Sequence, residues 1–350
     1  MAMTRRFGAL VALGAATALT VSAAPAQAAS SYVALGDSYS SGTGTRTYLN
    51  DGTSCQRSVY AYPSLISASK GLTLNFRACS GARVADVTNT QLGALTTSTT
   101  QVSISVGGND AGFADVLTEW AQPGWMSDCN GAIDGAQSII TNTLPARLST
   151  LYASIRAKAP NAKVVVVGYP RIFQGEDCNA FTWFSPAEET RLNQTADLLN
   201  SKTSAQAAAK GFTFVNPTSR FSGHAVCDDV EWLNGLSNPV SESYHPNVAG
   251  HRDGYAPLVS TPLTGSAFRV SSATLRQAER SADRLATQQR RYAAADATIS
   301  PEQFRAPDLT TAEAKAAARR AGVDLRSRAS IDAADRAWSQ RQAEARTSSP

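Results

Sequence analysis

The 350-residue chain has only three histidines, and its five cysteines include no C-x-x-C pair. A structural zinc site draws about four ligands from closely spaced Cys and His residues, and the sequence offers no such group. We therefore predict that the protein holds no metal ion.

Two motifs that mark common enzyme classes are also missing. No G-x-S-x-G occurs, so the chain lacks the nucleophile turn of the α/β-hydrolases. Gly42-Thr43-Gly44 and Gly107-Gly108 are rich in glycine, but neither completes the G-x-G-x-x-G of a dinucleotide-binding loop. Thr47 stands where the third glycine after Gly42 would be needed. We therefore expect no nucleotide cofactor, and no other cofactor is predicted.

Long hydrophobic runs are absent except at the N-terminus. There Arg5 and Arg6 precede an apolar stretch of residues 7–21, which is followed by Ala26-Gln27-Ala28. This order is typical of a secretory signal peptide with an A-x-A cleavage site. The stretch is short for a membrane span. We predict that residues 1–28 are a signal peptide, that the mature chain is secreted and that it has no transmembrane segment.

Excess positive charge is confined to the end of the chain. Of the 32 Lys and Arg, 15 lie in residues 268–350, together with 10 of the 28 Asp and Glu. Residues 1–267 therefore carry 17 basic and 18 acidic side chains. A nucleic-acid-binding domain concentrates basic charge on one face. The nearly neutral body argues against a nucleic-acid partner.

Five apolar, β-rich runs alternate with helical patterns in the body of the chain. The runs are residues 32–35, 72–78, 101–106, 163–167 and 212–215, and the helical patterns are residues 60–69, 135–158 and 186–209. Continuous apolar runs are typical of parallel strands that helices cover on both faces. The sequence therefore predicts an α/β fold, a three-layer α/β/α sandwich with a central parallel sheet of about five strands.

Polar residues follow the first three of these runs. Gly36-Asp37-Ser38 puts Ser38 at the carboxyl end of the first strand, where open α/β sheets bind ligands. CSGAR (79–83) and SVGGND (105–110) follow the second and third strands, and SESYHPNVAGH (241–251) contains His245. These four blocks, in this order, resemble the SGNH hydrolases, or GDSL esterase/lipase family. The residues around these blocks are most similar to those of the secreted actinobacterial lipases and phospholipases of that family.

The resemblance implies a flavodoxin-like fold and assigns the candidate catalytic residues. A serine nucleophile needs a base within hydrogen-bond reach, and the family pattern selects His245 for Ser38. The same pattern implies an oxyanion hole made by the backbone N–H groups of Ser38 and Gly81 and the side-chain amide of Asn109. Glu242 stands where the family commonly has an aspartate. Either Glu242 completes a triad, or a backbone carbonyl of the same turn supports a Ser–His dyad.

The resemblance also implies two disulfides, Cys55–Cys79 and Cys178–Cys227, with Cys129 left unpaired. Cysteine spacing alone does not choose among the possible pairings. The aromatic residues beside the second disulfide are Phe181, Trp183, Phe184 and Trp232. They suit either a lipid-facing rim or packing against that disulfide.

The composition changes at Phe268, beyond the residues that the resemblance covers (about 30–262). Glycine nearly disappears, and Ala, Arg, Gln and Asp dominate. Apolar residues three and four apart between Leu275 and Tyr292 predict a helix, and Thr310-Thr311-Ala312-Glu313 is a capping box for another that ends at Gly322. We predict a catalytic domain at 29–267 and a helical, partly mobile extension at 268–350. The two alternatives for the extension are a disordered tail and a helical hairpin docked on the body.

These features predict a secreted, monomeric carboxylic-ester hydrolase, a lipase or esterase and possibly a phospholipase, that works through an acyl-enzyme on Ser38. Its partner is an ester or lipid substrate. One alternative is a carbohydrate acetyl esterase, because related folds remove acetyl groups from polysaccharides. The other is a surface-binding protein whose basic extension makes peripheral contact with lipid or cell wall.

Overall fold

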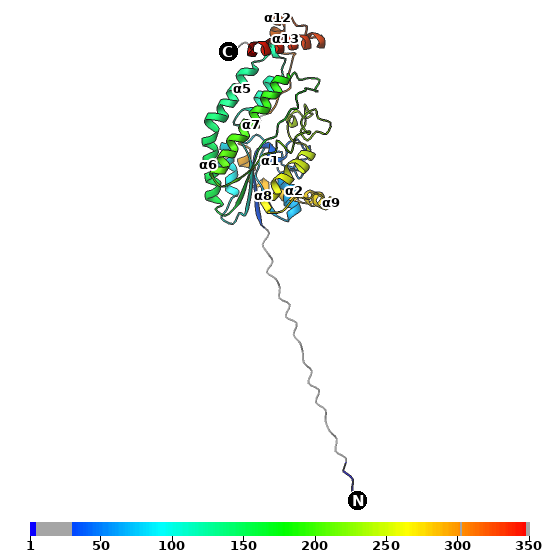
Figure 1. Cartoon of the computed structure of the whole chain (residues 1–350). Coiled ribbons are helices and arrows are strands. Elements are labelled where there is room, and N and C mark those ends of the chain that lie inside the picture. The colour runs from blue at the N-terminus through cyan, green and yellow to red at the C-terminus, as the bar shows by residue number, and fades with distance from the viewer. Residues whose placement is uncertain (5–29, 302, 348–350) are drawn as a thin grey trace.

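Figure 1 shows the computed structural model of the chain, which describes residues 1–4, 30–301 and 303–347. The predicted signal peptide falls mainly on residues 5–29, which lie outside the described residues. Among the residues that are described, no helix combines the length and the apolar character needed to cross a bilayer.

A five-stranded parallel sheet forms the centre of the body, with the strand order β2-β1-β3-β4-β5. This is the order of the flavodoxin-like doubly wound fold. The strands are β1 (Ser31–Gly36), β2 (Thr73–Phe76), β3 (Gln101–Ser105), β4 (Lys163–Val167) and β5 (Thr213–Val215). The five predicted strands and their parallel arrangement are confirmed. The pairing of Gly36 with Ser105 aligns the carboxyl ends of the two central strands.

Helices cover both faces of this sheet. In Figure 1, α6 and α7 pack side by side on one face, and α2 and α8 lie on the other. The α-helices of the body are α1 (Ser38–Ser41), α2 (Tyr62–Lys70), α3 (Val84–Asp86), α4 (Phe113–Trp120), α5 (Cys129–Ser138), α6 (Leu144–Lys158), α7 (Pro186–Ala209) and α8 (Ala256–Thr264). The three-layer sandwich is therefore confirmed.

Short 3₁₀ and π segments link several of these helices. They are η1 (Val87–Gln91), η2 (Leu92–Ala94), η3 (Gly124–Met126), η4 (Ile139–Thr143), η5 (Val240–Glu242) and η6 (Gly250–Tyr255). The single helix predicted at 135–158 is in fact α5, η4 and α6 in succession, and it begins earlier, after the Asp128 cap. By contrast, α7 has the predicted bounds, because Ser185 and Glu188 form a capping box at its start.

The extension is largely helical, and helices from its first and last parts contact the body. Its helices are α9 (Ser272–Arg280), α10 (Ala282–Arg290), α11 (Ala293–Asp296), α12 (Ala312–Ala321) and α13 (Arg328–Thr347). Figure 1 shows α9 beside α2, whereas α12 and α13 lie at the opposite end of the body, where they contact η3. Of the two alternatives for the extension, docking is correct, but over a much longer path than one hairpin.

Candidate active site

The turn that follows β1 places Ser38 at the first position of α1. Gly36 has a φ of +119°, and a Cβ there would lie 2.2 Å from the carbonyl oxygen of Ser105, so the neighbouring strand leaves room only for glycine. The Asp37 carboxylate caps α1 by accepting the N–H of Tyr39 at 3.1 Å. It also accepts the Ser105 hydroxyl at 2.7 Å. These contacts fix the nucleophile turn against the adjacent strand.

Asp37 is itself buried, with 1% of its surface exposed. Burial raises the pKa of Asp37 to about 6, and hydrogen bonds from Tyr169, Ser105 and the backbone oppose that rise. Every contact of this carboxylate is with the turn or its supporting strands. Its role is therefore to hold the turn in place.

His245 faces Ser38 across the end of the sheet. Its Nε2 lies 2.9 Å from the Ser38 hydroxyl oxygen, and its Nδ1 lies 2.9 Å from the Ser243 carbonyl oxygen. A carbonyl can only accept a hydrogen bond, so Nδ1 carries the proton and Nε2 is left as the acceptor for Ser38. Burial lowers the pKa of His245 to about 4, which keeps the imidazole neutral at pH 7. A serine that is activated by a general base needs a contact of this kind.

The backbone around His245 is tied to the nucleophile helix. The Tyr39 hydroxyl donates to the carbonyl oxygen of Tyr244 at 2.8 Å. The Tyr39 ring also lies 5.4 Å, centroid to centroid, from the imidazole. One residue of α1 therefore sets the position of the histidine loop relative to Ser38.

Glu242 is buried but is not brought to His245. Its Oε1 accepts the Tyr48 hydroxyl at 2.5 Å, and its Oε2 lies 3.5 Å from Arg46 Nε. The partner of the His245 Nδ1 is instead the Ser243 carbonyl. Of the two alternatives that the sequence leaves open, the geometry fits the dyad. Both partners of this carboxylate come from the segment that follows α1, and neither is His245.

The candidate oxyanion donors come from three successive strand ends. Asn109 follows Gly107, whose φ of +124° allows the sharp turn after β3. One N–H of the Asn109 amide donates to the Ala82 carbonyl at 3.0 Å, which leaves its other N–H for a ligand. Within the described part of the chain, nothing accepts a hydrogen bond from the backbone N–H of Ser38 or Gly81. Of these three residues, Ser38 and Asn109 line the same cavity.

An apolar cavity opens beside Ser38, Asn109 and His245. The space between its atoms is about 660 Å³, which includes open solvent at its mouth. Its apolar wall comes from Phe113, Leu117, Tyr169, Pro170, Ile172, Ala196, Leu199, Tyr244 and Phe304. Sequence reasoning missed these residues, because nothing in a strand or helix pattern marks which apolar side chains line a cavity. Gly81 is not among the lining residues.

The other two histidines have structural environments. His251 has no exposed surface, its Nδ1 accepts the Tyr62 N–H at 3.4 Å, and burial lowers its pKa to about 3. The His224 ring stacks on Trp232 at 3.7 Å between centroids. Neither imidazole contacts Ser38.

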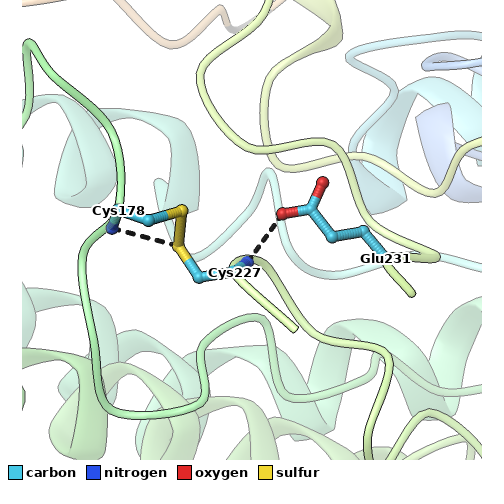
Figure 2. Close-up of side chains that lie close together, drawn as sticks. All are labelled: Cys178, Cys227 and Glu231. Carbon is cyan, nitrogen blue, oxygen red and sulfur yellow. Dashed lines mark hydrogen bonds between the residues drawn. A yellow bond between two sulfur atoms is a disulfide. The ribbon is translucent and has the colours of Figure 1, made fainter. Parts of the chain in front are cut away.

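Both disulfides join the cysteines that the family resemblance implies, Cys55–Cys79 and Cys178–Cys227. Figure 2 shows the second one beside Glu231, whose carboxylate accepts the Cys227 N–H at 2.7 Å. The two sulfurs of this group are bonded to each other, so they do not offer the thiolates that a metal would need. Cys129 is the one unpaired cysteine among the described residues, and burial raises the pKa of its thiol.

The aromatic residues near the second disulfide divide into two groups. Trp183, Phe184 and Trp232 are at least nine-tenths buried, whereas Phe181 is 66% exposed. The rings of Phe184 and Phe173 pack with 4.8 Å between their centroids. These three residues therefore lie in the packed interior and do not form a lipid-facing rim.

Residues 34–252 match the model of the GDSL-like lipase/acylhydrolase family. This chain belongs to that family. A lipase of Streptomyces coelicolor, Lipase 1, is 44% identical over 256 residues, which make up 72% of this chain and 94% of that protein. A lipase of Streptomyces rimosus is 43% identical over 72% of this chain and 93% of its own length. The GDSL-like chain described above is thus a carboxylic-ester hydrolase.

Two solved structures match this chain closely enough to compare folds. The extracellular lipase of Streptomyces rimosus has a TM-score of 0.64 and 43% identity, and phospholipase A1 of Streptomyces albidoflavus has a TM-score of 0.63 and 41% identity. In each case, 67% of this chain covers the whole of the solved chain. The family match ends at residue 252, so the extension lies beyond it.

Proposed function

We propose that this family member is a secreted lipase, esterase or phospholipase that cleaves acyl esters through an acyl-enzyme on Ser38. The observation that carries the proposal is the 2.9 Å contact between the His245 Nε2 and the Ser38 hydroxyl, beside an apolar cavity. A serine hydroxyl becomes an effective nucleophile when such a base takes its proton. The catalytic domain in this proposal comprises residues 29–267.

In the first half of the reaction, the Ser38 hydroxyl oxygen attacks the ester carbonyl carbon while Nε2 of His245 takes the hydroxyl proton. The carbonyl oxygen becomes negatively charged in the tetrahedral intermediate. The N–H groups of Ser38 and Gly81 and the Asn109 amide donate hydrogen bonds to it. Losing one such donor typically costs about 3–4 kcal/mol of transition-state stabilisation.

The intermediate then collapses, and the bond to the alcohol oxygen breaks. His245 returns its proton to the departing alcohol, which leaves the acyl group bonded to Ser38. Water enters, His245 takes one of its protons, and the resulting hydroxide equivalent attacks the acyl carbon. The acid departs, and Ser38 regains its proton from His245.

The imidazole carries a positive charge in both halves of the reaction, and the Ser243 carbonyl is proposed to stabilise it. Its hydrogen bond to Nδ1, at 2.9 Å, fixes the tautomer that leaves Nε2 free. Ser243 is thus a positioning residue, and the proposed site is a Ser–His dyad. Glu242 acts in this scheme only as an anchor of the turn, through Tyr48 and Arg46.

The apolar wall of the cavity supports an acyl substrate of medium or long chain. The relatives named as lipases and as a phospholipase A1 support a lipid ester over a carbohydrate ester. Burying each CH₂ group of such a chain contributes about 0.8 kcal/mol to binding. A lipid substrate therefore gains affinity here, whereas an acetyl group gains almost none.

Secretion by a signal peptide at residues 1–28 and a monomeric state complete the proposal. The match to an extracellular lipase supports secretion. We also propose that the 15 basic residues after Phe268 allow peripheral contact with an anionic surface. Each Lys or Arg near such a surface contributes roughly 1 kcal/mol.

Replacement of the nucleophile tests the assignment. We expect Ser38→Ala to lower kcat for p-nitrophenyl butyrate by about 10⁴-fold or more, because no oxygen remains to form the acyl-enzyme. Ser41→Ala is the matched control, since Ser41 lies in the same short helix and its hydroxyl contacts the Ser38 carbonyl at 3.3 Å instead of His245. Its activity should stay within a few-fold of wild type. A turnover rate of Ser38→Ala close to that of the wild type would contradict the proposal.

The same assay separates the dyad from the triad. In a triad, removing the carboxylate charge lowers kcat by about 10⁴-fold. Because Glu242 does not contact His245, we expect Glu242→Gln to keep kcat within about tenfold of wild type. A loss near that of Ser38→Ala, in a variant with an unchanged melting temperature, would establish Glu242 as the third member.

The substrate class is tested by comparing kcat/KM for p-nitrophenyl acetate, butyrate, octanoate and palmitate, with phosphatidylcholine as a phospholipid. Values that rise beyond acetate support the lipid-ester proposal. A maximum at acetate, together with release of acetate from acetylated polysaccharide, would instead support a carbohydrate esterase.

A further inference from the structure

A short stretch of the extension runs along the candidate active site. We call it the strap and define it as residues 299–301 and 303–306. Ile299 and Phe304 are both at least nine-tenths buried, and Ala306 packs against the same core. Apolar side chains thus fasten the strap to the body on both sides of its middle.

The middle of the strap lies against the loop that supplies a candidate oxyanion donor. A Cβ added to Gly81 would lie 2.4 Å from the Cα of Pro301 and 3.0 Å from the carbonyl oxygen of Ser300. Real Cβ atoms do not approach other atoms so closely, so the strap occupies the space that any side chain at Gly81 would need. The extension therefore borders the site directly.

Phe304 of the strap forms part of the apolar wall of the cavity. Its side chain lines the same cavity as Ser38, Asn109 and His245. The Phe304 ring meets the Tyr244 ring edge-on, with 4.9 Å between the centroids. A residue of the extension and the residue before the proposed base are thus packed together.

Contacts on each side of the strap keep Phe304 in place. Before it, the buried Asp296 carboxylate accepts hydrogen bonds from Arg57 and Arg77, each at 2.6 Å. After Phe304, the Arg305 N–H donates to the Thr118 hydroxyl of α4 at 2.9 Å. Farther on, the Gly124 N–H donates to the Asp335 carboxylate at 2.8 Å.

Figure 1 shows that the strap joins two separated parts of the extension. The helices before the strap lie near α2, and the helices after it lie at the opposite end of the body. The chain must cross the body between these two anchored parts. Phe304 is thus a buried part of the cavity wall with held chain on each side of it.

We infer that the strap closes one side of the acyl-binding cavity and that Phe304 limits the length of the acyl chain the enzyme accepts. This inference rests on the proposed function. The remaining wall residues come from the catalytic domain, so the extension adds a specificity determinant that lies outside the family match. One methylene group more or less in an apolar pocket changes kcat/KM by about tenfold or more.

Replacing Phe304 with smaller side chains tests the inference in the full-length protein. We would measure kcat/KM of Phe304→Ala and Phe304→Leu for p-nitrophenyl palmitate and butyrate. The ratio of palmitate to butyrate should rise about tenfold in Phe304→Ala and by less in Phe304→Leu, because the space vacated admits more of the chain. Phe268→Ala is the matched control, since Phe268 lies at the start of the same extension, packs partly buried on the body and does not line the cavity. Its ratio should equal that of wild type.

The melting temperature of each variant is measured alongside. If Phe304→Ala does not fold, the ratio measured for Phe304→Leu tests the inference instead. An unchanged or lower ratio in a folded Phe304 variant overturns the inference, and so does an equal rise in Phe268→Ala. A wild-type protein that cleaves none of the esters would refute the proposed function itself, whatever the variants do.

Discussion

The imidazole of His245 combines two requirements that oppose each other. It must be close to Ser38, which buries it, and it must accept a proton, which burial disfavours. The Ser243 carbonyl partly offsets this cost by favouring the protonated ring, but burial is the larger effect and lowers the pKa to about 4. The base is therefore available well into the acid range.

The activity should depend on pH through the protonation of His245. Only the neutral imidazole can take the Ser38 proton, so kcat/KM should fall as the pH drops through the pKa of His245. Because that pKa is about 4, we expect half-maximal kcat/KM near pH 4 and nearly full activity at pH 6. Release of butyric acid, measured between pH 3 and 8, checks this. A half-maximum near the ordinary histidine value of about 6.5 contradicts it.

Stability must be followed in the same experiment, because buried neutral histidines also link folding to pH. Burial lowers the pKa of His251 to about 3, below the unfolded value of about 6.5. Between these values the unfolded chain binds more protons, so His251 contributes stability that is lost as the pH falls from about 6.5 toward 3. Circular dichroism at each pH separates loss of fold from protonation of the base.

At the level of single side chains, the sequence predicted some residues of the candidate site and not others. Ser38 and His245 were predictable, because the motif blocks fix their type and order, and their 2.9 Å contact agrees with that expectation. The partner of Nδ1 was not predictable. A backbone carbonyl has no sequence signature, and the nearby Glu242 attracts attention while its carboxylate turns to Tyr48.

Helices and strands were predicted best where a local rule fixes their ends. The capping box at Ser185 and Glu188 gives α7 its start, and Gly322 ends α12 in the left-handed conformation that favours glycine. Helix α5 begins earlier in the chain than the predicted helix. Its start depends on Asp128, which accepts the Gly131 N–H, in a stretch with little apolar periodicity.

The path of the extension was beyond sequence reasoning for a different reason. Its periodic apolar residues, such as Leu285, predicted helices, and the helices are present. The partners of those helices lie about 200 residues away along the chain, and no local pattern names them. Phe304 shows the consequence, since nothing near it in sequence marks a residue of the active site.

Burial of charge ties the extension to the body. Asp296, Arg57 and Arg77 have no exposed side-chain surface, and the two guanidinium groups share one carboxylate. Asp51, 2.7 Å from Arg57, supplies the other negative charge. The Arg77 guanidinium also stacks on the Tyr292 ring of the extension at 3.9 Å. Two positive and two negative charges thus balance only while the extension is docked.

Removal of the Asp296 charge should therefore destabilise the body and the extension together. Asp296→Asn leaves Arg57 and Arg77 buried with Asp51 as their one counter-charge in this cluster, and losing one partner of a buried pair typically costs about 3–5 kcal/mol. Urea unfolding followed by fluorescence and circular dichroism measures the loss. Asp283→Asn is the control, since Asp283 is exposed in the same extension and its loss should cost about 0.5 kcal/mol or less. Both probes should report one transition, shifted to lower urea in Asp296→Asn.

Two separate transitions in the wild type would mean that the extension folds independently of the body. A loss of stability equal to that of Asp283→Asn would mean that the ion cluster does not hold the extension on the body.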